Sequence, residues 1–406
     1  MTVFERDSEL LRLLRPPRLR TLDEEEGHRH ASYLELFFDL VFVVAVAQLA
    51  HELVLDHTLH GFAVFGALYL PLFIAWQGFS IYADRFDTDD LVFRLVVLAG
   101  MLAILALAVQ VPDAAHGDGA GFAISYFVVR YLLVGLYVRA YRHVPEARPL
   151  VVRYGTGYAV GAALWIVSLA FDAPERYVLW GVGLAWEYAL PWLARALFPS
   201  IPVHTSHVPE RFALFTLIVL GESVLAVALG VADRDWALSA AVIAGLGFVA
   251  AAAVWWVYFG HGLEFAVERA PGSILVFAYA HIPLLVALTA IGAGITLAIE
   301  QSSASGLDAG TRWALAGGAA AYLVFLTLAQ SRMVLGFLPR TAQSRVLAAC
   351  GLVALAALGG GLRPVAFTAL ATAVLVGLVV FKLWTAHREA AASADLDAVA
   401  FTSSAT

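Results

Sequence analysis

The sequence predicts an all-α polytopic membrane protein with about twelve transmembrane helices. Hydrophobic residues make up 61% of the 406 residues and charged residues 14%, whereas a soluble protein carries about 25% charged residues. Apolar runs of about 20 residues, long enough to span a bilayer as a helix, recur along the chain between short polar connections. We therefore expect no inserted soluble domain. The single cysteine excludes an intramolecular disulfide.

The first 31 residues are charged throughout, and we expect a cytoplasmic tail without a cleavable signal peptide. Leucines and arginines at 8–15 have the spacing of an amphipathic helix. This segment is expected either to lie on an anionic membrane surface or to be a solvated tail that ends at Pro16 and Pro17.

Arginines set the expected orientation of the spans, because positively charged residues gather in cytoplasmic connections. With the N-terminus in the cytoplasm, most arginines fall inside, so both termini are expected to be cytoplasmic. The expected spans are 33–54, 60–82, 90–111, 120–141, 149–171, 176–198, 211–232, 236–260, 272–299, 311–331, 343–361 and 364–386.

A weak internal repeat accompanies these spans, because Leu36-Phe37 opens span 1 much as Leu214-Phe215 opens span 7. Six spans per half would make two parallel repeats. The end of the chain, rich in Ala, Ser and Asp, is expected to be a disordered cytoplasmic tail. The expected divisions are 1–31, 32–200 for spans 1–6, 201–387 for spans 7–12, and 388–406.

The stretch from Ser32 to Ala45 organises the chain, because it is apolar yet carries two acids four residues apart. On a helix this spacing places Glu35 and Asp39 on one face. A carboxylate that faces lipid costs several kcal/mol. We therefore expect this face to point inward, toward protein or water.

A second such stretch runs from Arg211 to Ser223 and carries Glu222 near the middle of its span. Gly221 before the acid permits close helix approach or local unwinding, and Ser223 can hydrogen-bond the carboxyl group. No basic residue stands within two turns of Glu222 on its own helix. Its partner must come from another span, or the group is often protonated.

Glu187, Arg130 and His281 also fall near the middle of their spans, where ionisable groups are functional candidates. They could instead pair, Arg130 with Glu187 or Asp39 for instance, and fix helix packing. At this depth the acids outnumber the bases. An excess of buried acid is typical of a proton or cation pathway.

The aromatic residues have an ordinary interpretation. Trp76, Tyr82, Trp255 and Trp256 fall near the cytoplasmic ends of their spans, where an interfacial aromatic belt is expected.

Metal and cofactor chemistry is poorly supported. His204-x-x-His207-x-x-Glu210 has ligand types, but it lies in a proline-containing loop without a helix to set its geometry. There is no phosphate-binding loop. We predict no metal, no cofactor and no nucleic-acid partner.

The motifs at 35–43 and 210–223 resemble the bacterial low temperature requirement A family, and the resemblance extends over about 30–385. It implies a membrane protein with a part in growth in the cold, and it implies no substrate or reaction. The motif positions carried over are Glu35, Asp39, Arg211, Gly221, Glu222 and Ser223.

The first functional hypothesis is a proton- or cation-coupled secondary transporter of the inner membrane. Asp39 and Glu222 would be its coupling acids, and Glu35, Arg130, Glu187, Ser223 and His281 would line its path. The second is a membrane-embedded enzyme or lipid-handling protein that uses the acids as general acid and base. The third is a sensor or scaffold. The expected partners are the lipid bilayer and a small solute or ion; the substrate, its direction and the oligomeric state stay open.

Overall fold

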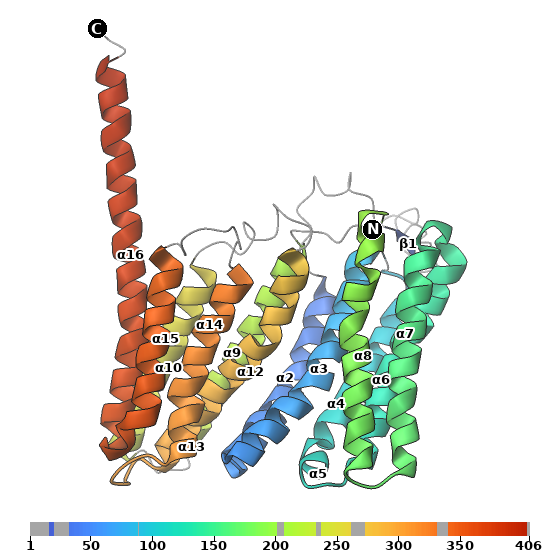
Figure 1. Cartoon of the computed structure of the whole chain (residues 1–406), viewed down its shortest axis with the longest axis horizontal. Coiled ribbons are helices and arrows are strands. Elements are labelled where there is room, and N and C mark those ends of the chain that lie inside the picture. Colours follow the sequence, from blue (N-terminus) through green and yellow to red (C-terminus); the bar gives the residue numbers. More distant parts are fainter. Residues whose placement is uncertain are drawn as a thin grey trace, which may run out of the picture. The chain divides into compact units, whose positions relative to one another are not determined.

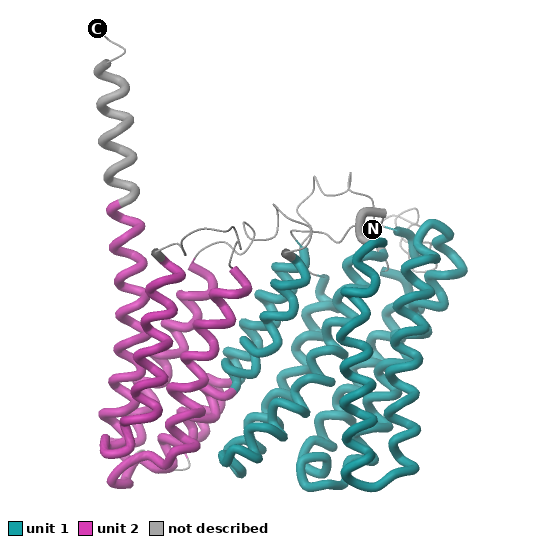
Figure 2. The backbone as a smooth tube through the Cα atoms, viewed as in Figure 1, with its two compact units in different colours: residues 1–222, 263–289 teal, residues 223–262, 290–406 magenta. Residues whose placement is uncertain are grey.

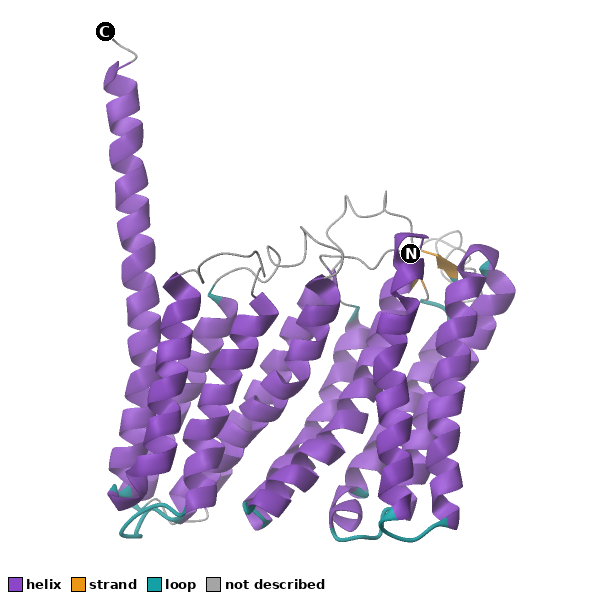
Figure 3. Cartoon of the chain, in the orientation of Figure 1, coloured by secondary structure: helices purple, strands orange, loops and turns teal. Residues whose placement is uncertain are grey.

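The computed structural model describes residues 16–19, 32–87, 89–200, 207–232, 237–260, 273–330 and 340–403. Almost all of them are helical (Figure 3). Eleven helices within these ranges are long and apolar enough to cross a membrane, which confirms an all-α polytopic membrane protein. Figure 1 shows the helices by label.

The sixth predicted span, 176–198, corresponds to α8 (Glu175–Ala194), a 20-residue helix outside those eleven. This helix carries three tryptophans and two tyrosines together with Glu187 and Pro191. The helix packs along α7 (Arg148–Val167). Hydropathy alone therefore undervalues a helix whose polar side chains turn toward other helices.

The chain forms two compact units (Figure 2). Unit 1 comprises residues 1–222 and 263–289, and unit 2 comprises 223–262 and 290–406. The unit boundary falls inside two long helices, α9 (His207–Ala232) and α12 (Ser273–Glu300). The predicted halves divide instead near residue 200, and their relation as parallel repeats stays a prediction.

Unit 1 is a helical bundle of α2 (Tyr33–Leu55), α3 (Leu59–Arg85), α4 (Leu91–Val109), α6 (Ala120–His143) and α7. Helix α2 packs on α3 and α4, α4 on α6, and α6 on α7. Small elements join these helices: α5 (Val111–Ala115), a 3-10 turn at Pro145–Ala147 and another at Ser168–Ala170.

The N-terminal region is attached to this bundle by a short antiparallel pairing. Strand β1 (Arg18–Leu19) pairs with β2 (Phe86–Asp87), the link between α3 and α4. Leu19 lies opposite Phe86, which is fully buried. The predicted amphipathic segment at 8–15 lies outside the described residues.

In unit 2, α10 packs on α16, α16 on α15, and α15 on α14. Buried Tyr322 donates a hydrogen bond to the Val254 carbonyl at 3.0 Å and so ties α14 to α10. The elements are α10 (Leu238–Phe259), α13 (Ala309–Arg312), the π-helical turn Trp313–Gly317, α14 (Gly318–Gln330), α15 (Arg340–Leu358), a 3-10 turn at Gly359–Gly361 and α16 (Pro364–Ser403). The tail predicted to be disordered, 388–406, falls mostly in the last part of α16, where no side chain beyond Arg388 is described, and its disorder stays a prediction.

Gly294 on α12 permits a close backbone contact in unit 2. A Cβ at this position would lie 2.7 Å from the Cα of Leu315 and 2.8 Å from the carbonyl carbon of Ala314. Backbone cannot rotate away as a side chain can. We expect Gly294→Ala to destabilise the protein by about 1–3 kcal/mol, measured as a lower unfolding temperature in detergent. Gly351→Ala is the control, because nothing lies within 4 Å of its Cβ; an equal loss in both variants would contradict the packing role.

Candidate functional site

The start of α2 is held by a capping box. The Ser32 N–H donates to the Glu35 carboxylate at 2.7 Å, and the Glu35 N–H donates to the Ser32 hydroxyl at 3.3 Å. Glu35 is 5% exposed and Asp39 is fully buried, so both acids turn inward, as their spacing predicts. The carboxylate of Glu35 thus satisfies a backbone donor at the helix end.

Asp39 accepts two short hydrogen bonds on one oxygen. The Trp76 indole N–H of α3 and the Arg211 guanidinium of α9 both donate to its Oδ1 at 2.7 Å. The same guanidinium nitrogen lies 3.3 Å from the Ser80 hydroxyl. Arg211 is 2% exposed. A buried charge is tolerated only when paired and hydrogen-bonded, so this contact gathers α2, α3 and α9 around one ion pair.

Helices α3 and α9 face each other through residues repeated every four positions, which places them on single helix faces. Trp76, Ser80 and Asp84 lie on α3, and His207, Arg211 and Phe215 lie on α9. We call these six residues the α3–α9 ladder.

The two outer rungs of this ladder differ in chemistry. At one end Nδ1 of His207 lies 3.1 Å from Oδ1 of Asp84, and both side chains are buried. At the other end the rings of Trp76 and Phe215 stack with centroids 4.4 Å apart. The middle rung is the Ser80–Arg211 contact that joins Asp39. One helix pair therefore carries an imidazole–carboxylate pair, an ion pair and an aromatic stack in succession.

Aromatic rings pack on Trp76, the residue that donates a hydrogen bond to Asp39. Phe212 packs edge-on against Trp76 with ring centroids 5.0 Å apart, and against His281 at the same separation. His281 is fully buried, and its Nδ1 lies 2.7 Å from the Phe277 carbonyl one turn back on α12. The structure thus places His281 against Phe212 and Phe277.

Arg130 and Glu187 form a separate buried ion pair between α6 and α8, with 2.8 Å between Nη2 and Oε2. The Tyr126 hydroxyl donates to the same Glu187 oxygen at 2.7 Å. The guanidinium carbon of Arg130 stands 4.1 Å from the Tyr158 ring centroid. Of the partners that the sequence left open for Arg130, the structure selects Glu187.

Glu222 differs from these acids. It is 6% exposed, and its Oε2 has no hydrogen-bond partner among the residues that the structure describes. No ion pair with Glu222 is present among them either. Helix α9 runs unbroken through Gly221, where a Cβ would meet nothing within 4 Å. Gly221 therefore provides neither the unwinding nor the close approach that its position suggests.

Ser223 meets a glycine on a different helix. A Cβ at Gly292 of α12 would lie 2.5 Å from the Ser223 hydroxyl oxygen, within unit 2. The close approach in this region therefore depends on Gly292.

The excess of buried acid is smaller than the sequence predicts, because one more arginine lies inside a helix and pairs with an acid. Helix α9 begins at His207 rather than at 211, so Arg211 lies one turn inside and neutralises Asp39. Arg130 neutralises Glu187. Of the three mid-span acids, Glu222 alone is left without a basic partner in the described parts of the chain.

Several members of the site are not evident from sequence. Trp76 and Tyr82 are fully buried rather than interfacial, so the predicted aromatic belt is wrong for both, whereas Trp255 is 42% exposed. The four-residue spacing of Trp76, Ser80 and Asp84 was a readable signal. Their partners on α9 lie more than 120 residues away in the chain.

The structure describes only part of the pattern His204-x-x-His207-x-x-Glu210. His207 faces Asp84, and His204 lies outside the described residues. Within the described ranges, no three His, Cys, Asp or Glu side chains gather as a metal site would require.

The helices and buried charges define a multi-pass helical membrane protein. In the described residues its spans hold the Asp39–Arg211 and Arg130–Glu187 ion pairs, and they hold Glu222, which has no basic partner there. The chain belongs to the bacterial low temperature requirement A (LtrA) family, whose model matches residues 30–380. An uncharacterized protein of Rhizobium meliloti (strain 1021) is 28% identical over 299 residues, which cover 68% of this chain and 71% of that protein.

Proposed function

We propose that this protein is a proton- or cation-coupled secondary transporter of the inner membrane, with cytoplasmic termini. The observation that carries the proposal is Glu222, a buried acid without a basic partner in the described residues. A permanent negative charge inside a span is costly, so such a group is stable when it holds a proton or a bound cation. Exchange of that proton or cation between the two sides would drive a solute.

The Asp39–Arg211 pair supports a second role in the same cycle. One Asp39 oxygen accepts both hydrogen bonds, while Oδ2 has no partner among the described residues. Within the same residues, neither Nε nor Nη1 of Arg211 is hydrogen-bonded. The pair therefore keeps unused hydrogen-bonding capacity on both sides. A solute or a coupling ion that enters could engage these atoms without first breaking the short contact. We propose that this pair is the solute-sensing element beside the coupling acid.

The depths of the two acids favour a transporter over an enzyme. Asp39 follows the start of α2 by six residues, about 9 Å along the helix. Glu222 follows the start of α9 by fifteen residues, about 22 Å. A lipid-processing enzyme would gather its acids at one headgroup level. Groups spread along the membrane normal instead suit a pathway across it.

The decisive experiment measures proton movement in liposomes that hold the purified protein and a trapped pH-sensitive dye. Gradients of sodium, potassium and small amino acids serve as the probes. The wild-type protein is expected to move protons with a rate that depends on pH between about 5 and 8, and Glu222→Gln is expected to abolish that dependence. Glu222→Asp should leave a weaker, still pH-sensitive protein.

Glu146→Gln provides a matched control, because Glu146 is an exposed acid in the connection between α6 and α7. It should leave the proton flux unchanged. If Glu222→Gln keeps the full wild-type pH profile, Glu222 is not the coupling acid and serves packing alone.

A further inference from the structure

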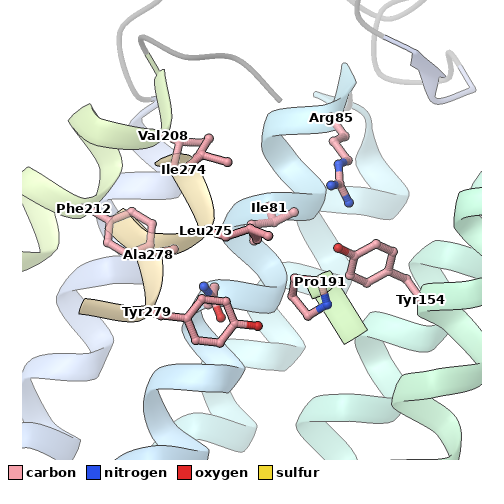
Figure 4. A pocket seen from close by; sticks show the side chains of 11 residues that line it. Ile81, Arg85, Tyr154, Pro191, Val208, Phe212, Ile274, Leu275, Ala278 and Tyr279 are labelled. Atoms are coloured by element: carbon pink, nitrogen blue, oxygen red, sulfur yellow. The ribbon is translucent and has the colours of Figure 1, made fainter. Parts of the chain in front are cut away.

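The buried arginine and lysine side chains differ in the partners that the described parts of the chain give them. In unit 1, Arg130 and Arg211 form ion pairs with acids. Arg85 lies in the wall of a small cavity, where Figure 4 shows its guanidinium group and the Tyr154 hydroxyl pointing toward one another. The other two buried cations, Arg345 and Lys382, are 7% and 5% exposed and belong to unit 2.

Lys382 on α16 has no partner among the described residues, because its buried Nζ makes no hydrogen bond to any of them. Arg345 on α15 donates from Nη1 to Oε1 of Gln330, at the end of α14, at 2.7 Å. This contact occupies one of the five N–H donors of the guanidinium group. The charges of Arg345 and Lys382 lie near enough to repel each other. Two like charges are therefore gathered inside unit 2.

The described side chains of unit 2 provide no counter-ion at this place. The acids among them are Glu300 and Asp308, which flank the connection from α12 to α13. The helical run Ala309–Gln330, 22 residues or about 33 Å long, separates that connection from Gln330. A buried ammonium group without a counter-ion is strongly unfavourable. An anion from outside the described residues would therefore stabilise this end of the unit.

The position of Lys382 along α16 indicates the headgroup level of the membrane. It follows the start of the helix by eighteen residues, about 27 Å, and the hydrocarbon core is about 30 Å thick. Trp384 is 51% exposed, and the guanidinium carbon of Arg388 stands 4.5 Å from its ring centroid. An exposed tryptophan beside an arginine is typical of a membrane interface. Figure 1 shows α14 ending and α15 beginning at this same end of unit 2.

The surroundings of Lys382 favour a lipid as the source of the anion. Helices α15 and α16 are the two least buried of the eleven spans described. Phe381 and Leu383, the chain neighbours of Lys382, are 39% and 49% exposed. A lysine ammonium group ends a flexible four-carbon stem, so it can reach the headgroup level along apolar surface. Phospholipids carry a phosphate group at that level, and its oxygens accept hydrogen bonds from ammonium and guanidinium groups.

We propose that Lys382 and Arg345 bind the phosphate group of an anionic phospholipid at the end of unit 2 where α14 ends and α15 begins. Basic side chains between membrane helices bind such headgroups through their negative charge. Phosphatidylcholine carries the same phosphate beside a positive choline, so it would leave the two cations unneutralised. Binding of the lipid requires no transport and does not depend on the function proposed above.

The test is the thermal unfolding of the purified, delipidated full-length protein in a nonionic detergent. Phosphatidylglycerol is added in increasing amounts, and phosphatidylcholine or inorganic phosphate is added to parallel samples. We expect a saturable rise of about 2–4 °C in the unfolding temperature with phosphatidylglycerol alone, since a ligand that binds only the folded state stabilises it by mass action. No rise with phosphatidylglycerol, or an equal rise with phosphatidylcholine, would overturn the proposal. An equal rise with inorganic phosphate would overturn the assignment to a lipid.

Two variants locate the site. Lys382→Met removes the charge and keeps an unbranched side chain, so it should lose the rise with phosphatidylglycerol. Without lipid it should unfold at or above the wild-type temperature, because it removes a buried ammonium group that has no described partner. Arg345→Gln should also reduce the rise, and it decides the matter if Lys382→Met does not fold.

Arg363→Met is the matched control, because Arg363 is an exposed cation that directly precedes the other end of α16. It should keep the full rise with phosphatidylglycerol. A rise in Lys382→Met equal to that of the wild type would refute the site.

Discussion

Replacement of Arg211 by glutamine is expected to destabilise the protein by about 3–5 kcal/mol, because it leaves a fully buried Asp39 without its counter-ion. Asp39→Asn should have an effect of the same size, since it strands a guanidinium group that is 2% exposed. The measurement is the unfolding temperature of each variant in detergent, together with the yield of folded protein from membranes.

The double variant Asp39→Asn with Arg211→Gln isolates the ion pair. It removes both charges and keeps similar shapes, so it should recover part of the loss. Asp89→Asn supplies the matched control, because its pair with Arg94 has the same chemistry but side chains 72% and 45% exposed. An exposed pair contributes less than about 1 kcal/mol. Wild-type stability in both single variants would show that the contact does not hold the helices together.

The second large effect concerns Arg130 and Glu187, whose side chains are fully buried. Glu187→Gln or Arg130→Gln is expected to cost about 3–5 kcal/mol, because either change leaves one charge unpaired where water cannot reach it. Tyr126→Phe should cost less, about 1–3 kcal/mol, since it removes one hydrogen bond to a carboxylate that keeps its arginine. The measurement is the thermal unfolding in detergent of the wild-type protein and these three variants.

The pair also discriminates between a structural and a transporting role for these residues. Arg130 and Glu187 neutralise each other's charge, so we expect folded variants to keep the pH dependence of proton movement in liposomes. The Glu222→Gln variant is the reference that loses it. Loss of pH dependence in a well-folded Glu187→Gln protein would move Glu187 into the coupling path and contradict this assignment.

The membrane fold and the inward direction of the first acids follow from sequence. Hydrophobic runs of helical length have few alternatives in a bilayer, because an unpaired backbone group is costly there. The four-residue spacing of Glu35 and Asp39 likewise determines that they share a face, and a carboxylate face avoids lipid. The motifs at 35–43 and 210–223 also carried enough information to indicate the family, which the match over 30–380 confirms.

The partners of the buried charges could not be predicted. Asp39 meets Trp76 across 37 positions of the chain and Arg211 across 172. Sequence indicates how deep a residue lies in its span, but it does not indicate which neighbouring helix its side chain faces. The contact with Arg211 also depends on α9 beginning at His207, one turn before the predicted start of the span. The prediction that Trp76 lies in an interfacial belt is wrong for the same reason, because the position of a residue along its span gives its depth but not the direction of its side chain.

Sequence alone thus determined that this chain crosses a membrane many times as helices, that its first acids face inward, and to which family it belongs. Those properties depend on composition and on spacing within single helices, where the bilayer itself imposes the constraint. Only the tertiary structure decided that Asp39 and Glu187 are neutralised by Arg211 and Arg130, while Glu222 is not so neutralised within the described residues. The physical reason is that pairing requires two side chains within about 4 Å, and helix packing decides which pairs meet.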